Sequence, residues 1–161
     1  MAKSKSAVPE GYHTLTPQLM LDNAAQTIEW YKRALGVEEL SRFVGPDGKI
    51  MHAEMKVGNS RFTVGEVMQN QKGPKALGAL PVSLWLYVEN SDALFNKAVS
   101  AGGKVHMPMT DQFWGDRAGA FTDPAGYVWW VATHTEDMSK DEMHRRADEF
   151  FKQPQPQHAG S

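Results

Sequence analysis

The chain has 161 residues, of which 41% are hydrophobic and 22% charged, and its formal net charge is −2. This length allows one domain with a sizeable core or two small fused modules. The scattered, nearly balanced charge disfavours nucleic acid as a partner, and the lack of a long apolar run disfavours a membrane span or a secretory signal. The absence of cysteine excludes disulfides and thiol chemistry and fits the cytoplasm, which we expect to be its location.

The first half of the chain predicts a strand, a helix and three further strands. Residues 1–10 are polar without periodicity, and we expect them to be disordered. Asp22 or Asn23 can cap the helix, and Gly36 ends it. The five elements are predicted, in chain order, at 14–21, 24–35, 37–44, 50–57 and 61–67. Residues 11–68 are therefore predicted to form one β-α-β-β-β module.

The same order of elements returns after a polar connector at 69–81. Asn90 or Ser91 can cap the helix of this half, which ends at Gly102. The strands of this half are predicted at 82–88, 104–109, 118–121 and 127–131. Because strand, cap, helix, glycine stop and hairpin recur in register, we predict a second copy of the module at 82–134.

A tight turn, Asp123-Pro124-Ala125-Gly126, joins the last two predicted strands. Strand alternation then places Trp129 and Trp130 on opposite faces of the final strand. Both indoles can fill a core, or one of them can form the wall of a ligand-binding cavity.

The end of the chain predicts a helix outside the repeat. Ser139 and Glu142 form a capping box that opens a helix through Phe151, within a C-terminal helical segment at 135–152. This helix is expected to cover a sheet edge or a partner subunit. Residues 153–161 offer nothing to bury and are expected to be disordered.

Several spaced motifs occur together with the repeat: Leu21-Asp22-Asn23, Leu35-Gly36, Phe113-Trp114-Gly115-Asp116-Arg117 and Asp123-Pro124-x-Gly126. On these motifs the chain resembles the vicinal oxygen chelate superfamily, the glyoxalase and bleomycin-resistance fold, and most of all its PhnB-like branch. The resemblance implies an α+β fold of two tandem βαβββ modules that form a curved, cup-shaped mixed sheet, often completed by a dimer. It leaves the function open, because this fold supports enzymes as well as binding proteins without catalysis.

The resemblance also implies four positions at which catalytic relatives hold a divalent metal. These positions carry Leu15, Ser83, Trp130 and Glu66 in this chain. Only Glu66 is a metal-ligand type, and one carboxylate does not hold a metal, so we expect no metal and no other cofactor. The alternative is a metal site rebuilt from nearby side chains, namely His13, Gln18, His52, Glu54 and His106.

His52 and Glu66 form the best candidate catalytic pair, because adjacent antiparallel strands can bring an imidazole beside a carboxylate. A satisfied polar pair without chemistry is equally consistent with the pattern. Asp116 and Arg117 are expected to form an internal ion pair that holds their loop, although both can also orient a ligand at the rim. His134, which is followed by acidic residues, is interpreted as part of a structural turn.

Aromatic side chains take the place of the missing metal ligands, which suits stacking of a planar ligand. Alternation puts Ser83, Trp85 and Tyr87 on one strand face. Trp30 is expected on or near a helix surface and is given no role. The candidate ligand-binding residues are Trp85, Tyr87, Phe113, Trp114, Trp130, Gln18, Ser83 and Arg117.

The sequence therefore predicts a metal-free protein that binds a planar or aromatic small molecule, antibiotics among the candidates, and that forms a homodimer. The alternative is a glyoxalase-like lyase, isomerase or dioxygenase that uses either a divalent metal or the His52 and Glu66 pair. A third hypothesis is a structural module whose cup is filled by its own side chains. Nucleic acid and membranes are not expected as partners.

Overall fold

The structure, a computed structural model, describes residues 6–68 and 71–152. The disorder predicted for 153–161 and for the first five residues lies outside these ranges. Residues 6–10 form neither helix nor strand. In the described chain, no helix combines the length and the apolarity that crossing a bilayer requires.

Two βαβββ modules follow one another, which confirms the predicted fold class. The first module consists of β1 (Gln18–Leu21), α1 (Ala24–Leu35), β2 (Glu38–Val44), β3 (Ile50–Val57) and β4 (Ser60–Glu66). The second consists of β5 (Ser83–Tyr87), α3 (Ser91–Ser100), β6 (Lys104–Asp111), β7 (Asp116–Thr122) and β8 (Val128–His134). A short helix, α2 (Pro74–Leu77), interrupts the connector, and α4 (Lys140–Lys152) follows the second module.

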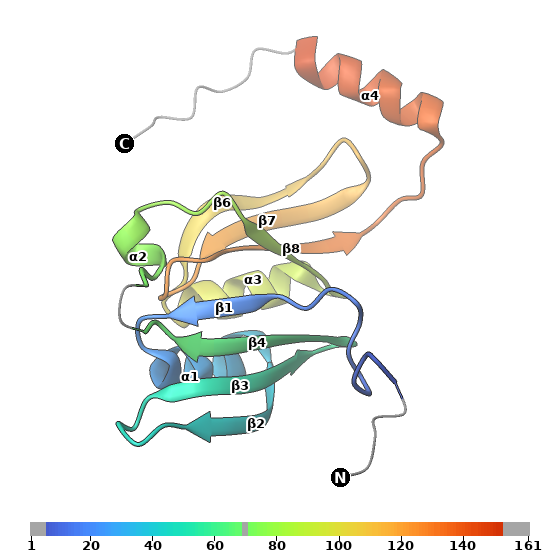
Figure 1. The fold of residues 1–161 in the computed structure, drawn as a ribbon. Coiled ribbons are helices and arrows are strands. Elements are labelled where there is room, and N and C mark those ends of the chain that lie inside the picture. Colours follow the sequence, from blue (N-terminus) through green and yellow to red (C-terminus); the bar gives the residue numbers. More distant parts are fainter. Residues whose placement is uncertain (1–5, 69–70, 153–161) are drawn as a thin grey trace.

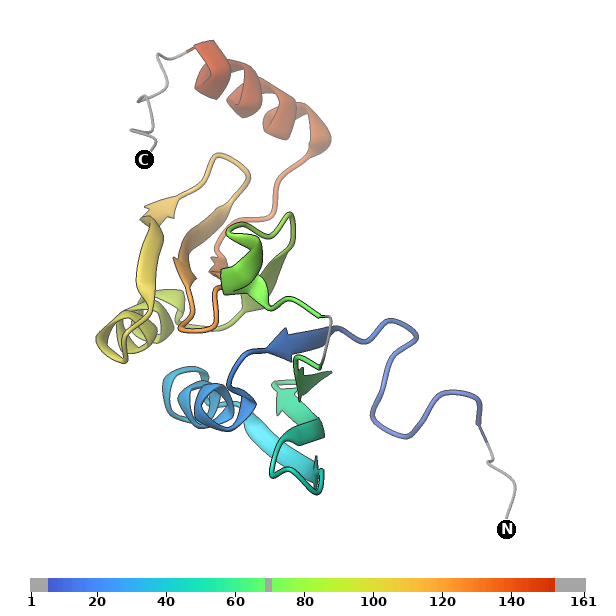
Figure 2. The same cartoon turned by 60° about the vertical axis from the view of Figure 1, so that its left-hand side comes forward.

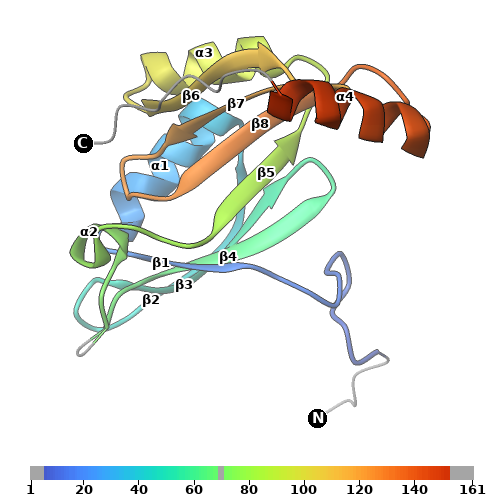
Figure 3. The same cartoon turned by 90° about the horizontal axis from the view of Figure 1, so that it is seen from above.

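Each module forms its own four-stranded mixed sheet with the same topology (Figure 1). The strand orders are β1-β4-β3-β2 and β5-β8-β7-β6, and in each sheet the first strand pairs in parallel while the other pairs are antiparallel. Viewed from above, β5 lies between β8 and the first sheet (Figure 3). The repeat seen in the sequence is thus a repeat of topology.

The helices begin and end where their capping residues predict. The Asn23 side chain accepts a hydrogen bond from Gln26 N at 3.2 Å, and Gly36 ends α1 in the left-handed region at φ 67°. The Asn90 side chain caps α3 in the same way, accepting from Ala93 N at 2.9 Å. Helices α1 and α3 lie side by side and contact each other (Figure 2). They bury one face of both sheets in a single core.

A buried carboxylate in the β7–β8 turn holds the two modules together. Asp123 Oδ1 accepts hydrogen bonds from three backbone N–H groups of its own turn, at 2.8 to 2.9 Å. Its Oδ2 accepts from Trp129 Nε1 at 2.9 Å and from the Tyr31 hydroxyl, on α1 of the other module, at 2.7 Å. Burial raises the pKa of Tyr31 well above its usual value, and the Asp123 charge adds to the shift, so the hydroxyl stays a donor.

Two further contacts join the modules and correct one prediction. The Tyr127 hydroxyl donates to Met20 O and accepts from Met20 N, each at 3.1 Å, on strand β1. Trp30 is buried rather than on a helix surface, and its Nε1 donates to Ala101 O at the end of α3 at 2.8 Å. The prediction for Trp30 was wrong because the face of α1 that carries it is covered by α3 of the other module.

We predict that Tyr31→Phe lowers the free energy of unfolding by about 1.5–3 kcal/mol, the usual contribution of a hydrogen bond to a charged group. The ring stays in place, so only the bond to Asp123 is removed. Urea denaturation followed by circular dichroism measures the change. The control is Tyr12→Phe, on the N-terminal segment, for which we expect a smaller loss; an equal loss in both variants would contradict the role of Asp123.

Candidate ligand-binding site on the second sheet

The second sheet has one face buried against α3 and one open face. Strand alternation divides them: Trp129 and Val131 face the core, while Trp130 lies on the open face. Trp85 is the register partner of Trp130 on the adjacent parallel strand. Their rings stack in parallel with centroids 4.7 Å apart. The two predicted tryptophans are therefore brought into direct contact by strand pairing.

Tyr87 extends this stack along β5. Its ring lies 6.2 Å from that of Trp85 at an interplanar angle of 27°. Trp85 is 41% exposed and Tyr87 63% exposed, so the rings are open to solvent. We call Trp130, Trp85 and Tyr87 the aromatic platform. At its Trp130 end, a hollow of about 440 Å³ is also lined by Ser83 and His106.

A second buried carboxylate, Asp116, borders the platform on the same face. It is 3% exposed and is the register partner of His134. Its Oδ2 accepts from the Tyr87 hydroxyl at 3.0 Å and from Trp114 Nε1 at 2.9 Å. Its Oδ1 lies 2.8 Å from His134 Nδ1. Burial alone would raise the pKa of Asp116, but the hydrogen bonds from His134, Trp114 and Tyr87 outweigh burial and lower it.

His134 is held between two carboxylates. Nδ1 contacts Asp116, and Nε2 lies 3.0 Å from Asp137 Oδ1. The hydrogen bond to Asp116, followed by that to Asp137, raises the pKa of His134 above its usual value. Any stability that the protonated ring contributes is therefore fully present below about pH 6.5 and is lost as the pH rises through the raised pKa. The sequence interpretation placed His134 in a structural turn, but in the structure it is the last residue of β8 and lies on the open face of the sheet.

The expected ion pair between Asp116 and Arg117 does not form, because neighbours in a strand point to opposite faces. Arg117 instead contacts Asp92 of α3 through Nε at 2.6 Å and Nη2 at 2.8 Å, and Asp111 through Nη1 at 3.1 Å. Its guanidinium is thus committed to the helix side of the sheet, away from the aromatic platform. The predicted contact of Arg117 with a ligand therefore stays a prediction, and it does not involve the aromatic platform.

Phe113 lies in the β6–β7 loop beside Trp114, with ring centroids 5.1 Å apart. On its other side it contacts α4, at 5.1 Å from the Phe150 ring and 6.2 Å from the Phe151 ring. Phe113 therefore packs between Trp114 and the C-terminal helix, and these ring contacts do not include the aromatic platform.

The remaining predicted residues belong to the first sheet, and His52 and Glu66 are not brought together. Glu66 points to the α1 side, where its carboxylate accepts from Ala24 N at 3.3 Å and Ile50 N at 3.1 Å. His52 lies on the opposite face, near Glu54, whose pKa is lowered mainly by a hydrogen bond from Tyr12 and to a smaller extent by His52. Gln18 is exposed on strand β1, on the opposite face of that strand from buried Leu19.

The four family metal positions do not fit a metal ion. The Glu66 oxygens are occupied by backbone N–H groups, Leu15 is 86% exposed, and Trp130 is stacked on Trp85. In the part of the chain that the structure describes, no group of three or more His, Cys, Asp or Glu side chains is placed to hold a metal.

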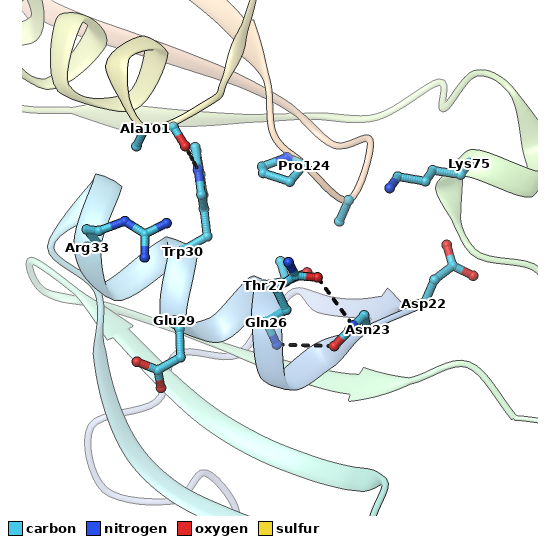
Figure 4. A pocket seen from close by; sticks show the side chains of 11 residues that line it. Asp22, Asn23, Gln26, Thr27, Glu29, Trp30, Arg33, Lys75, Ala101 and Pro124 are labelled. Atoms are coloured by element: carbon cyan, nitrogen blue, oxygen red, sulfur yellow. Dashed lines mark hydrogen bonds between the residues drawn. The ribbon is translucent and has the colours of Figure 1, made fainter.

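A further hollow, of about 460 Å³, lies between α1 and the β7–β8 turn (Figure 4). Figure 4 shows Trp30 and Arg33 on one side of it and Lys75 and Asp22 on the other. The Trp30 N–H is already used in the bond to Ala101, and charges of both signs line the walls. None of the predicted site residues lines this hollow, so the aromatic platform is the stronger candidate.

Comparison with known proteins decides the family. A family model described as the Glyoxalase/Bleomycin resistance protein/Dioxygenase superfamily matches residues 13–131. The chain belongs to this superfamily. Proteins of Mycobacterium bovis and Mycobacterium tuberculosis, both described as uncharacterised, are 35% identical over 134 residues; the match covers 80% of this chain and 88% and 79% of theirs.

Several solved structures share the fold of this chain. TioX from Micromonospora sp. ML1 is 23% identical with a TM-score of 0.63, covering 76% of this chain and 98% of that one. Protein PA1353 from Pseudomonas aeruginosa is 25% identical with a TM-score of 0.63, covering 77% and 99%. A PhnB protein from Bacillus cereus is 20% identical with a TM-score of 0.59, covering 75% and 99%. The predicted superfamily is confirmed by the family model, and these solved structures confirm the fold.

Sequence reasoning missed His134 as a member of the site and gave Asp116 a contact with a ligand only as an alternative to an ion pair with Arg117. A usable signal was present, since His134 lies an even number of residues after Trp130. It was assigned to a turn because acidic residues follow it, and the last strand was predicted to end at residue 131. The strand continues to His134, and β7 begins at Asp116 rather than at residue 118. Underestimated strand lengths therefore hid the polar end of the site.

Gly115 fixes the loop that positions Asp116. Its φ is +91°, and its carbonyl accepts hydrogen bonds from Thr135 N at 2.9 Å, Glu136 N at 3.0 Å and Thr135 Oγ1 at 2.8 Å. A Cβ at this position would collide with the Glu136 carbonyl oxygen. Only glycine combines this backbone conformation with so close an approach.

We predict that Gly115→Ala lowers the free energy of unfolding by about 3 kcal/mol or more, from the left-handed φ and the collision together. Thermal unfolding by calorimetry measures the loss. The matched control is Gly48→Ala, at φ +79° but with open space around the added Cβ, which should cost only about 1–2 kcal/mol. Equal losses would show that the approach of Glu136 is unimportant.

Proposed function

We propose that the protein binds a planar aromatic small molecule and that the aromatic platform is its contact surface. The observation that carries this proposal is the parallel stack of Trp130 and Trp85, which leaves Trp85 41% exposed. An aromatic ring that adds to such a stack gains about 0.5–1.5 kcal/mol beyond its burial. Adjoining exposed aromatic rings on one sheet face are typical of ligand or partner surfaces.

The binding is proposed to need no metal ion or other cofactor. The residues at the family metal positions support this, because one of them, Glu66, is used to bind the N-terminus of α1 and another, Trp130, belongs to the platform. The superfamily includes bleomycin resistance proteins by its description, so antibiotics with planar rings are among the ligands to test. The alternative of a His52 and Glu66 catalytic pair finds no support in their placement on opposite faces.

Isothermal titration with naphthalene-2-carboxamide, a neutral planar compound, tests the proposal. We expect binding accompanied by quenching of tryptophan fluorescence. Trp85→Ala should weaken binding by about tenfold or more, because it removes a stacking contact and the apolar area around it. Phe43→Ala is the control, since Phe43 is also exposed, at 65%, but lies on the first sheet.

Two results would contradict the proposal. One is the absence of heat and quenching with naphthalene-2-carboxamide and with a panel of planar antibiotics. The other is a stoichiometric divalent ion in protein purified without chelators, together with loss of its binding in Glu66→Gln. The second result would favour the enzymatic alternative.

We further propose that the protein forms a homodimer through α4. This helix projects away from both sheets, and none of residues 140–152 is buried (Figure 1). Its links to the described chain include Arg146 with Glu136, at 2.7 Å, and the ring contacts of Phe113. Phe151 is 71% exposed. A second copy of the chain that covers this side of α4 would remove its apolar surface from water.

We predict that the protein sediments as a dimer and that Phe151→Ser shifts it toward the monomer. A symmetric dimer loses the side chain twice, at about 1.5–3 kcal/mol for each buried Phe, so the dissociation constant should rise about 100-fold or more. Lys140→Ser, on the same helix, is the control and should change nothing. Sedimentation velocity measures both, and a monomeric wild-type protein at high concentration would refute the homodimer.

A further inference from the structure

His134 lies at the polar end of the proposed site. On β8 it follows Trp130 and Ala132 on the same face, with alternate residues of a strand about 7 Å apart. The Tyr87 ring joins the two ends, because it adjoins Trp85 and its hydroxyl contacts Asp116, which in turn holds His134. An open hollow of about 550 Å³ is lined by Tyr87, Val88, Glu89, Thr133 and His134.

The two ring nitrogens of His134 differ in how firmly they are held. Nδ1 is fixed by Asp116, which is almost fully buried and has two further donors, Tyr87 and Trp114. Nε2 contacts Asp137, whose side chain is fully exposed. An ion pair at full exposure contributes little and is easily exchanged for another carboxylate. The ring orientation is therefore fixed while the partner of Nε2 is replaceable.

We propose that the carboxylate of a planar aromatic acid replaces Asp137 at His134 Nε2, while its ring lies against Tyr87 at the end of the aromatic platform. This inference rests on the proposed function and adds to it the chemical class of the ligand. Asp137 shows that a carboxylate fits at this position, since its Oδ1 lies 3.0 Å from Nε2, to which the imidazolium can donate a hydrogen bond. A ligand that supplies the same group and a stacked ring makes two contacts where Asp137 makes one.

The charged groups around His134 set the pH range in which its ring is protonated and can bind a carboxylate. Asp116 and Asp137 contact the ring, and Glu89 lines the same hollow, where its charge opposes an anion. Tyr87 contacts Asp116 as a neutral donor whose own pKa is raised by burial and by that carboxylate. Since the carboxylates raise the pKa of His134, the imidazolium is retained up to that raised value. Preference for an anionic ligand is therefore present below it and lost as the pH rises through it.

A matched pair of compounds tests the inference on the full-length protein. Naphthalene-2-carboxylate and naphthalene-2-carboxamide offer the same ring with and without the charge. By isothermal titration below the pKa of His134, the carboxylate should bind about tenfold more tightly, as expected when a charge-assisted hydrogen bond replaces a neutral one. Above that pKa the two affinities should converge, with that of the amide unchanged.

Variants separate the two nitrogen contacts. His134→Gln, which keeps a donor toward Asp116 but removes the charge, should abolish the preference for the carboxylate over the amide. Asp137→Asn, measured below about pH 6.5 so that His134 stays protonated, should strengthen carboxylate binding alone, because it removes the competing anion. Thermal unfolding of both variants checks that the fold is retained, and Asp137→Asn keeps the test valid if His134→Gln unfolds.

The outcomes distinguish this inference from the function on which it rests. Equal binding of the two compounds at every pH, or weaker carboxylate binding in Asp137→Asn, would overturn the role of His134 and leave the aromatic site standing. Binding of neither compound would overturn both. A carboxylate preference that His134→Gln removes and Asp137→Asn increases would support both.

Discussion

The buried carboxylate of Asp123 is the interaction on which the arrangement of the two modules depends. It closes its own turn through three backbone N–H groups, orients Trp129 in the core, and accepts from Tyr31 of the other module. A buried charge is tolerated only when its hydrogen-bonding capacity is satisfied, and here donors from both modules are needed to satisfy it. The two sheets are thus fixed relative to each other by the hydrogen bonds of Asp123 as well as by the shared apolar core.

Asp116 is a second buried carboxylate whose oxygens are satisfied by hydrogen bonds. It lies on the open face of the second sheet, beside the proposed site, and not in the core between the modules. Its donors are Tyr87, Trp114 and His134, and all three rings are thereby held in fixed positions. A rigid set of aromatic and polar groups binds a flat ligand with little loss of conformational entropy. The left-handed Gly115 that precedes Asp116 makes this placement possible.

Two of the side chains at the expected metal positions of the superfamily take part in other contacts in this chain. At the family metal positions, Trp130 contributes to a stack and Glu66 accepts hydrogen bonds at the N-terminus of α1. Both side chains have acquired roles that exclude metal coordination. Under the proposed function, the strand positions at which the resemblance implies metal ligands include one, that of Trp130, which carries contact surface for a small molecule, and one fold can support such different functions.

The sequence by itself determined the duplicated module, the helix caps to within one residue, and the placement of Trp129 and Trp130 on opposite faces, because these depend on local periodicity and turn chemistry. The structure decided for Asn23 over Asp22 and for Asn90 over Ser91. Only the tertiary structure decided which side chains meet. His52 and Glu66 were separated by the faces on which they lie, while Trp85 and Trp130 were joined by parallel register. Contacts between distant strands depend on register and on strand ends, which local patterns define least well.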